Sequence, residues 1–200
     1  MLDKTVKHYG VMMVQKEKVY PSYQLPKGYT FSYYQIGDED EWAAIETAVG
    51  EFENQPEGKA YFLRTFGQEL EETKKRCLFV SDEHQNKIAT ASAWFGMFEG
   101  KKHPRIHWVA VDPEHRGKGI CKALMSEVLN RYSELEEDEQ VYLTTQTWSY
   151  TAINIYKKFN FFPYVDNRKG IIKGSSEDFE VDYDAAWTLI DDKIETYQKR

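Results

Sequence analysis

The chain has 200 residues, 41% of them apolar, and a formal net charge of −7, as expected for one globular domain with a substantial core. The negative charge argues against nonspecific nucleic-acid binding, and no apolar run approaches the roughly 20 residues of a membrane helix. Residues 11–14 form too short an apolar run for a signal peptide. The two cysteines, Cys77 and Cys121, suit a reducing compartment and form no metal-ligand spacing. We therefore expect a cytoplasmic protein with no metal, nucleic-acid or membrane partner.

The first 28 residues have little periodicity, and Pro21 and Pro26 break any helix there. Residues 9–14 have the composition of a short strand. The sequence predicts that residues 1–28 form an arm packed on a single domain that spans residues 29–200.

Residues 29–36 alternate weakly and predict the first core strand. Asp38 and Glu41 have the spacing of a capping box at the start of a helix. The apolar face of that helix consists of Trp42, Ile45, Val49 and Phe52. A second helix is predicted over residues 59–75, where three apolar residues recur every four positions: Phe62, Phe66 and Leu70.

Two strands are predicted over residues 77–81 and 87–95, joined by a polar turn at residues 82–86. The second strand has small residues on one face, which allow a helix to pack closely: Ala89, Ala91 and Ala93. Residues 96–104 are expected to form a loop that leads into a central strand at Arg105.

The central stretch, residues 105–132, has the pattern of a strand, a glycine turn and a helix. Residues 106–111 are nearly all apolar, as in a strand covered on both faces. Gly117 and Gly119 allow a tight turn after Asp112. The following helix has an apolar stripe of residues four apart: Ile120, Leu124, Val128 and Tyr132.

This arrangement suits the binding of a phosphate group. The first amides of a helix have no partner within it, and the helix dipole adds positive potential at that end. Arg116, Lys118 and Lys122 add full charges. The P-loop pattern is absent because Lys118 stands between the two glycines, and the dinucleotide fingerprint fails because Lys122 replaces its third glycine. The pattern that fits is R-x-x-G-x-(G/A) over residues 116–121.

This motif and the preceding VAVDPEHRGKGI run resemble the GNAT superfamily of N-acetyltransferases. The resemblance implies a mixed α/β fold whose central sheet is splayed between the fourth and fifth core strands, with helices on both faces. Acetyl-CoA is the implied cosubstrate. Cys121 departs from the family's usual Gly or Ala but is still small. Together with the strand before the turn, the resemblance implies these cofactor-binding residues: Val109, Ala110, Val111, Arg116, Gly117, Lys118, Gly119, Ile120, Cys121 and Lys122.

The C-terminal third predicts a solvated loop over residues 133–139, a strand over 141–147, a helix from Thr151 and a strand over 161–165. Residues 171–172 are assigned to part of a last strand. A final helix is predicted over residues 183–197, where four apolar residues align: Ala186, Ile190, Ile194 and Tyr197.

A second stretch, residues 149–161, resembles the family pattern N-x-x-A-x-x-x-Y-x-x-x-G-F. Three positions match: Ala152, Tyr156 and Phe161. Ser149 replaces the asparagine that holds the pantetheine arm, and we expect it to contact the cofactor. Asn160 replaces the glycine, and Asn tolerates positive φ.

The motif makes Tyr156 the candidate acid that protonates the departing thiolate, although a core tyrosine on an amphipathic helix has the same periodicity. Many relatives place a glutamate base where this chain has Thr144, which cannot accept a proton at neutral pH. His107 is the alternative base, predicted on the same strand face as Val109 and Val111. For His107 a hydrogen-bonded structural role is favoured over that of a base. A water chain with no single base is an equal alternative, and Glu99 and His103 are weaker candidates. The amide of Val109 is the expected oxyanion donor.

These features predict an acetyltransferase of EC class 2.3.1 that moves an acetyl group directly from acetyl-CoA to a primary amine. The acceptor is expected to be small and cationic, such as a polyamine, amino sugar or amino acid, and the N-terminus of a peptide is an alternative. The chain is expected to be a monomer or homodimer. Two alternatives remain at this point: a noncatalytic acyl-CoA-binding module, and a nucleotide-phosphate-binding enzyme that uses residues 116–120.

Overall fold

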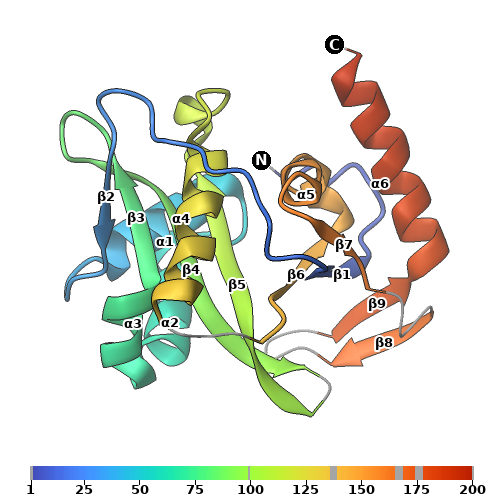
Figure 1. Ribbon diagram of the computed structural model, residues 1–200, viewed down its shortest axis with the longest axis horizontal. Helices are drawn as coiled ribbons and strands as arrows, with labels where there is room; N and C mark the ends of the chain where they lie inside the picture. Colours follow the sequence, from blue (N-terminus) through green and yellow to red (C-terminus); the bar gives the residue numbers. More distant parts are fainter. Residues whose placement is uncertain (1, 99, 136–138, 165–168, 174–177, 200) are drawn as a thin grey trace. The chain divides into compact units, whose positions relative to one another are not determined.

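The computed structural model describes residues 2–98, 100–135, 139–164, 169–173 and 178–199 (Figure 1). The chain divides into two compact units. The first holds residues 21–139, and the second holds residues 2–20 and 140–200.

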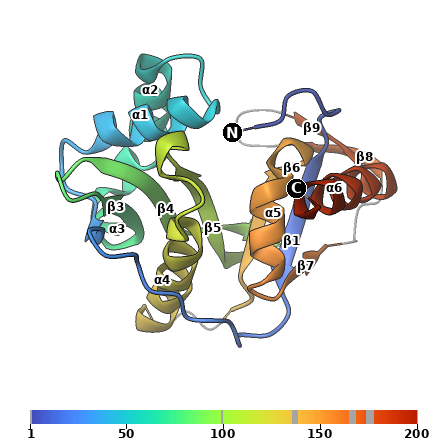
Figure 2. The ribbon, with the colours of Figure 1, turned by 90° about the horizontal axis from the view of Figure 1, so that it is seen from above.

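The first unit contains four antiparallel strands in the order β2-β3-β4-β5. Their bounds are Thr30–Tyr33 (β2), Cys77–Ser81 (β3), Lys87–Phe98 (β4) and Lys101–Val111 (β5). The helices are Glu39–Val49 (α1), Gln55–Thr65 (α2), Leu70–Arg76 (α3) and Ile120–Glu134 (α4), with 3₁₀ turns at Gly67–Glu69 (η1) and Pro113–His115 (η2). Helices α1 and α2 cover one face of these strands and α4 covers the other (Figure 2).

The two faces of this sheet are packed differently, as the alternation in β4 predicts. The face toward α4 carries Ala89, Ala91 and Ala93, all fully buried, and these small side chains let the helix lie close. The face toward α1 and α2 is filled by large aromatic side chains from both helices and strands: Tyr34, Trp42, Phe62, Phe66, Phe79 and Trp94.

The second unit has three strands in the order β6-β1-β7, with β1 antiparallel to both neighbours. Their bounds are Gly10–Gln15 (β1), Tyr142–Gln146 (β6) and Phe161–Pro163 (β7). The other elements are a 3₁₀ turn at Thr147–Ser149 (η3), helices Tyr150–Lys157 (α5) and Tyr183–Gln198 (α6), and a separate hairpin of Lys169–Lys173 (β8) and Asp178–Asp182 (β9). The N-terminal segment thus supplies the middle strand of this unit.

The structure confirms the mixed α/β class and the final helix, but the predicted capping box at α1 is wrong. Asp38 is the N-cap residue, yet its side chain makes no capping hydrogen bond. Its carboxylate instead accepts the backbone N–H of Gln35 and forms an ion pair with Lys87 of β4. A partner distant in sequence therefore takes the group that local spacing assigned to the helix.

The predicted helix over residues 59–75 is also wrong as one element. Helix α2 ends at Thr65, and the chain turns at Gly67–Glu69 before α3 begins. The hydroxyl of Thr73, in α3, donates to the carbonyl of Phe66 at 2.8 Å and so holds the break. Apolar residues four apart on both sides of the turn gave the appearance of one helix.

Residues 96–104 form strand rather than the predicted loop. Strand β4 continues to Phe98, which pairs with Lys101 at the start of β5. Gly100, with φ of 78°, occupies the turn between them. Helix α4 likewise extends beyond the prediction to Glu134. Parts of the predictions for residues 133–139 and 161–165, and the candidate Glu99, lie outside the described residues.

Candidate functional site

Strand β5 contains a bulge at the centre of the predicted site. Ser92 of β4 pairs with His107, whereas Thr90, two residues earlier, pairs with Ala110, so β5 holds one extra residue. Trp108 has φ of 51°, which is uncommon for a bulky residue. The bulge takes Trp108 and Val109 out of the ladder with β4, and bulges of this kind occur often beside active sites.

The bulge also changes the face on which His107 lies. His107 pairs with Ser92 and Val111 pairs with Ala89, and these two β4 residues are three apart and therefore point to opposite faces. The prediction that His107 shares a face with Val109 and Val111 is wrong, because one inserted residue reverses the alternation. His107 lies on the face covered by α1 and α2.

The imidazole of His107 lies in apolar surroundings, with its ring centroid 5.9 Å from that of Phe66. Burial, and secondarily the charge of Arg105, hold the pKa of His107 well below its usual range. The imidazole is therefore neutral at neutral pH and has a lone pair available for a proton.

The turn after β5 has the geometry of an anion-binding loop. Asp112 follows β5 and caps the 3₁₀ turn η2, because its carboxylate accepts the N–H of Glu114 at 2.8 Å. Gly117 and Gly119 have φ of 76° and 86°, a region that other residues rarely adopt. Gly119 is the N-cap of α4, and no side chain caps the helix. The first amides of α4 are thus left for an external acceptor.

Basic side chains surround this turn. Arg116 and Lys118 are exposed, and Arg116 is held by a 3.3 Å hydrogen bond from its Nε to the carbonyl of Val111. Lys118 donates to the hydroxyl of Tyr29 at 3.2 Å. The ammonium of Lys122 lies 5.3 Å from the ring centroid of Tyr23.

The segment that carries these tyrosines runs along α4. The hydroxyl of Ser126, in α4, donates to the carbonyl of Pro21 and accepts the N–H of Tyr23. Tyr29 also hydrogen-bonds to Nδ1 of His115 at 3.0 Å. Neither tyrosine was predicted from the sequence, because nothing local links them to residues 115–122, which lie 86 or more positions later in the chain.

Cys121 follows Ile120 in the first turn of α4 and is half-buried. Burial raises the pKa of its thiol to about 11. The thiol is therefore protonated at neutral pH and unsuited to act as a nucleophile, as expected for a small packing residue.

The residues of the second motif belong to the second unit. Ser149 is the N-cap of α5, with no side-chain cap bond, and Tyr156 is buried with its ring 6.4 Å from that of Phe161. Asn160 has φ of 61°, which confirms the expected positive φ after the helix. Thr144 is exposed on β6. We call residues 116–122, the glycine turn and the first residues of α4, the cradle. The cradle and His107 lie in the first unit.

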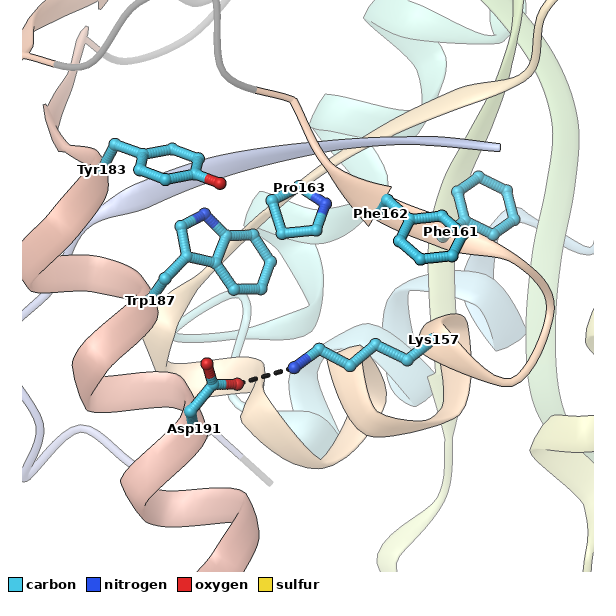
Figure 3. A pocket seen from close by; sticks show the side chains of 7 residues that line it. All are labelled: Lys157, Phe161, Phe162, Pro163, Tyr183, Trp187 and Asp191. Atoms are coloured by element: carbon cyan, nitrogen blue, oxygen red, sulfur yellow. Dashed lines mark hydrogen bonds and ion pairs between the residues drawn. The ribbon is translucent and has the colours of Figure 1, made fainter. Parts of the chain in front are cut away.

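The second unit also contains a pocket of about 380 Å³ between α5, β7 and α6 (Figure 3). An ion pair of 2.6 Å between Lys157 and Asp191 bridges the two helices at its edge. None of the predicted site residues lines it; the lining consists of Lys157, Phe161, Phe162, Pro163, Tyr183, Trp187 and Asp191.

The weaker candidate His103 lies on β5 rather than in a loop. It is buried, and its Nδ1 is 4.0 Å from a carboxylate oxygen of Glu139. Among the described residues, no group of His, Cys, Asp and Glu is arranged to hold a metal ion.

Glu46 is a residue that sequence analysis missed. It lies on α1 one turn after Trp42, its side chain is 1% exposed, and within the described part of the chain its Oε1 has no hydrogen-bond partner. The signal was a carboxyl within the apolar stripe formed by Trp42, Ile45 and Val49.

Comparison with known proteins agrees with this geometry. The model of the acetyltransferase (GNAT) family matches residues 33–161, which include the bulge, the cradle and both motifs. The chain belongs to the GNAT acetyltransferase family. The members of this family are acetyltransferases of EC class 2.3.1 that use acetyl-CoA. No curated protein matches the chain.

Several solved structures share the fold. A GCN5-related N-acetyltransferase from Sphaerobacter thermophilus is 22% identical, with a TM-score of 0.59 over 78% of this chain and 48% of that protein. A GNAT-family acetyltransferase from Colwellia psychrerythraea is 11% identical, with a TM-score of 0.61 over 78% and 53%. A predicted acetyltransferase from Clostridium acetobutylicum, solved with acetyl-CoA, is 17% identical, with a TM-score of 0.54 over 70% and 93%.

This chain spans about half the length of the first two of these proteins. At such identities the likeness shows the fold of this GNAT protein and leaves its acceptor open. Within the described residues, no helix has the length and apolar character needed to cross a membrane.

Proposed function

We propose that this GNAT protein transfers an acetyl group directly from acetyl-CoA to the primary amine of a small acceptor. The cradle carries this proposal. Two glycines with positive φ and an uncapped helix N-terminus follow a strand whose bulge frees backbone groups from the ladder.

The cradle supports binding of the CoA pyrophosphate. The amides of residues 117–121 donate to phosphate oxygens, and Arg116, Lys118 and Lys122 supply the opposite charge. Residues 109–111 of β5 run beside the pantetheine arm, and the amide of Val109 binds the carbonyl oxygen as it gains negative charge. Ser149 hydrogen-bonds the pantetheine arm, an assignment supported by the second motif.

The reaction needs three proton transfers. The acceptor's ammonium, with a pKa of ~10.4, loses a proton before its nitrogen attacks the thioester. His107 accepts that proton, which its neutral imidazole permits. When the tetrahedral intermediate collapses, the carbon–sulfur bond breaks and the CoA thiolate takes a proton from Tyr156. The phenolate of Tyr156 then recovers a proton from the nitrogen that has become the amide. A phenol of pKa ~10 can supply a thiolate whose thiol has a pKa of ~8.5.

The first prediction concerns the cradle. CoA should raise the melting temperature of the protein by several degrees at a concentration of ~100 times its dissociation constant. Gly119→Glu places a carboxylate where the pyrophosphate binds and should abolish the shift. Gly100→Glu is the matched control, because Gly100 also has positive φ but lies in the β4–β5 turn. A wild-type shift in Gly119→Glu would place the cofactor elsewhere.

The second prediction concerns Tyr156. Tyr156→Phe keeps the ring and removes the proton donor, so kcat should fall by ~10²-fold while the CoA-induced melting shift stays unchanged. Tyr150→Phe on the same helix should retain full activity. Wild-type turnover in Tyr156→Phe would leave this residue with a packing role only.

The third prediction concerns His107. A base must be unprotonated, so kcat at saturating acceptor should rise with pH and then level off. Since burial lowers the pKa of His107, the plateau should be reached well below pH ~6.5. His107→Gln should be slower and lack this acid limb. Full activity in His107→Gln would show that the proton leaves by another route.

A further inference from the structure

Glu46 places a carboxyl group in an apolar part of the core. Its neighbours along the buried side of α1 are Trp42, Ile45 and Val49, all at most 7% exposed. Burial of a polar group without a hydrogen bond costs free energy, and such groups are rare in native proteins. Oε1 of Glu46 has no such bond to any residue that the structure describes.

The charges near Glu46 make its ionisation harder. Burial raises the pKa of Glu46 well above its usual range, and the nearby carboxylate of Glu51 adds to the effect. Cys77, at the start of β3, is also affected. Burial raises the pKa of its thiol to about 12, and the charges of Asp38 and Glu46 raise it further. Among the described residues, no lysine or arginine is ion-paired with Glu46. If Glu46 ionises, its carboxylate therefore needs a cation supplied from outside the described residues.

Aromatic rings connect Glu46 to the bulge of β5. Trp42, one turn before Glu46, has its ring 5.3 Å from that of Trp108 at the bulge. The rings of Tyr61 and Phe52 lie 5.0 and 5.4 Å from Trp108. The faces of such rings attract a cation, most strongly when it is desolvated. Carboxyl and ring faces together select an alkylammonium group.

A cation bound at Glu46 cannot be the nitrogen that reacts. The attacking nitrogen must be neutral and must lie at the thioester, beside Trp108. Glu46 is four residues along α1 from Trp42, a rise of about 6 Å. An ammonium bound at Glu46 stays charged, so it is a second nitrogen of the acceptor.

We propose that Glu46 binds the distal ammonium of an aliphatic diamine acceptor, while the other amine is acetylated beside Trp108. This inference rests on the proposed function, since it identifies the acceptor of that reaction. When the diamine binds, the carboxyl of Glu46 releases its proton to solvent and forms an ion pair with the distal ammonium, flanked by the rings of Trp42 and Trp108.

Acceptor kinetics test this with two molecules of nearly equal size. At saturating acetyl-CoA, initial rates of CoA release are measured for 1,4-diaminobutane and for 4-amino-1-butanol, which replaces the distal ammonium by a neutral hydroxyl. Wild-type kcat/KM should be about tenfold or more higher for the diamine. Glu46→Gln should remove that preference, mainly by raising KM for the diamine, and should leave the amino alcohol within about twofold.

Two further variants separate a binding role from a structural one. Glu41→Gln, an exposed carboxylate on the same helix, should keep the wild-type preference. Glu46→Met should lose the preference as Glu46→Gln does. Both Glu46 variants should melt at or above the wild-type temperature, because each removes an unpaired buried carboxyl. A lower melting temperature in both would show that the fold needs Glu46 and would overturn the inference.

The outcomes distinguish this inference from the function on which it rests. If both amines are acetylated but Glu46→Gln keeps the wild-type preference, Glu46 does not bind the acceptor and the acetyltransfer proposal stands. If the wild type acetylates neither compound nor any amine of a broader panel, amine acetylation itself fails, and the inference fails with it.

Discussion

The bulge in β5 is the constraint on which the rest of the site depends. Trp108 adopts a φ that costs a bulky residue of order 1–3 kcal/mol, so its surroundings must compensate. The rings of Trp42, Phe52 and Tyr61 pack around its indole and supply this compensation. The distortion releases the backbone at Val109 from the ladder and turns His107 toward α1 and α2. Aromatic packing thus stabilises a backbone shape that a regular strand lacks.

The cradle depends on the opposite face of the same strands. Fully buried alanines on β4 let α4 pack closely, and the short connection from Val111 fixes where the helix begins. Gly117 and Gly119 then let the backbone turn without a side chain in the way. The strand face, the turn and the start of α4 therefore leave the first amides of the helix without a side-chain cap. The basic side chains add charge to a site that the backbone already defines.

The strand, the glycine turn and the helix that form the cradle were predictable from the sequence because their signals are local. The glycines, the basic residues and the apolar stripe of α4 all lie within a few turns of one another. The positive φ of Asn160 was predictable for the same reason. The sheet face on which His107 lies was not predictable. An extra residue in one strand can be recognised only from its register with the partner strand. The same limit explains why Asp38 was assigned to a helix cap rather than to Lys87, and why the burial of Glu46 was not predicted.

The most direct test of this account is an NMR titration of backbone amides with CoA and acetyl-CoA. The account predicts that the amide resonances of Gly117, Gly119, Ile120 and Cys121 shift with both ligands, and that the amide of Val109 responds most strongly to the acetylated form. The amides of α3 should stay unchanged. Saturable binding with no shift at the four cradle residues would contradict the central claim that the turn before α4 holds the cofactor.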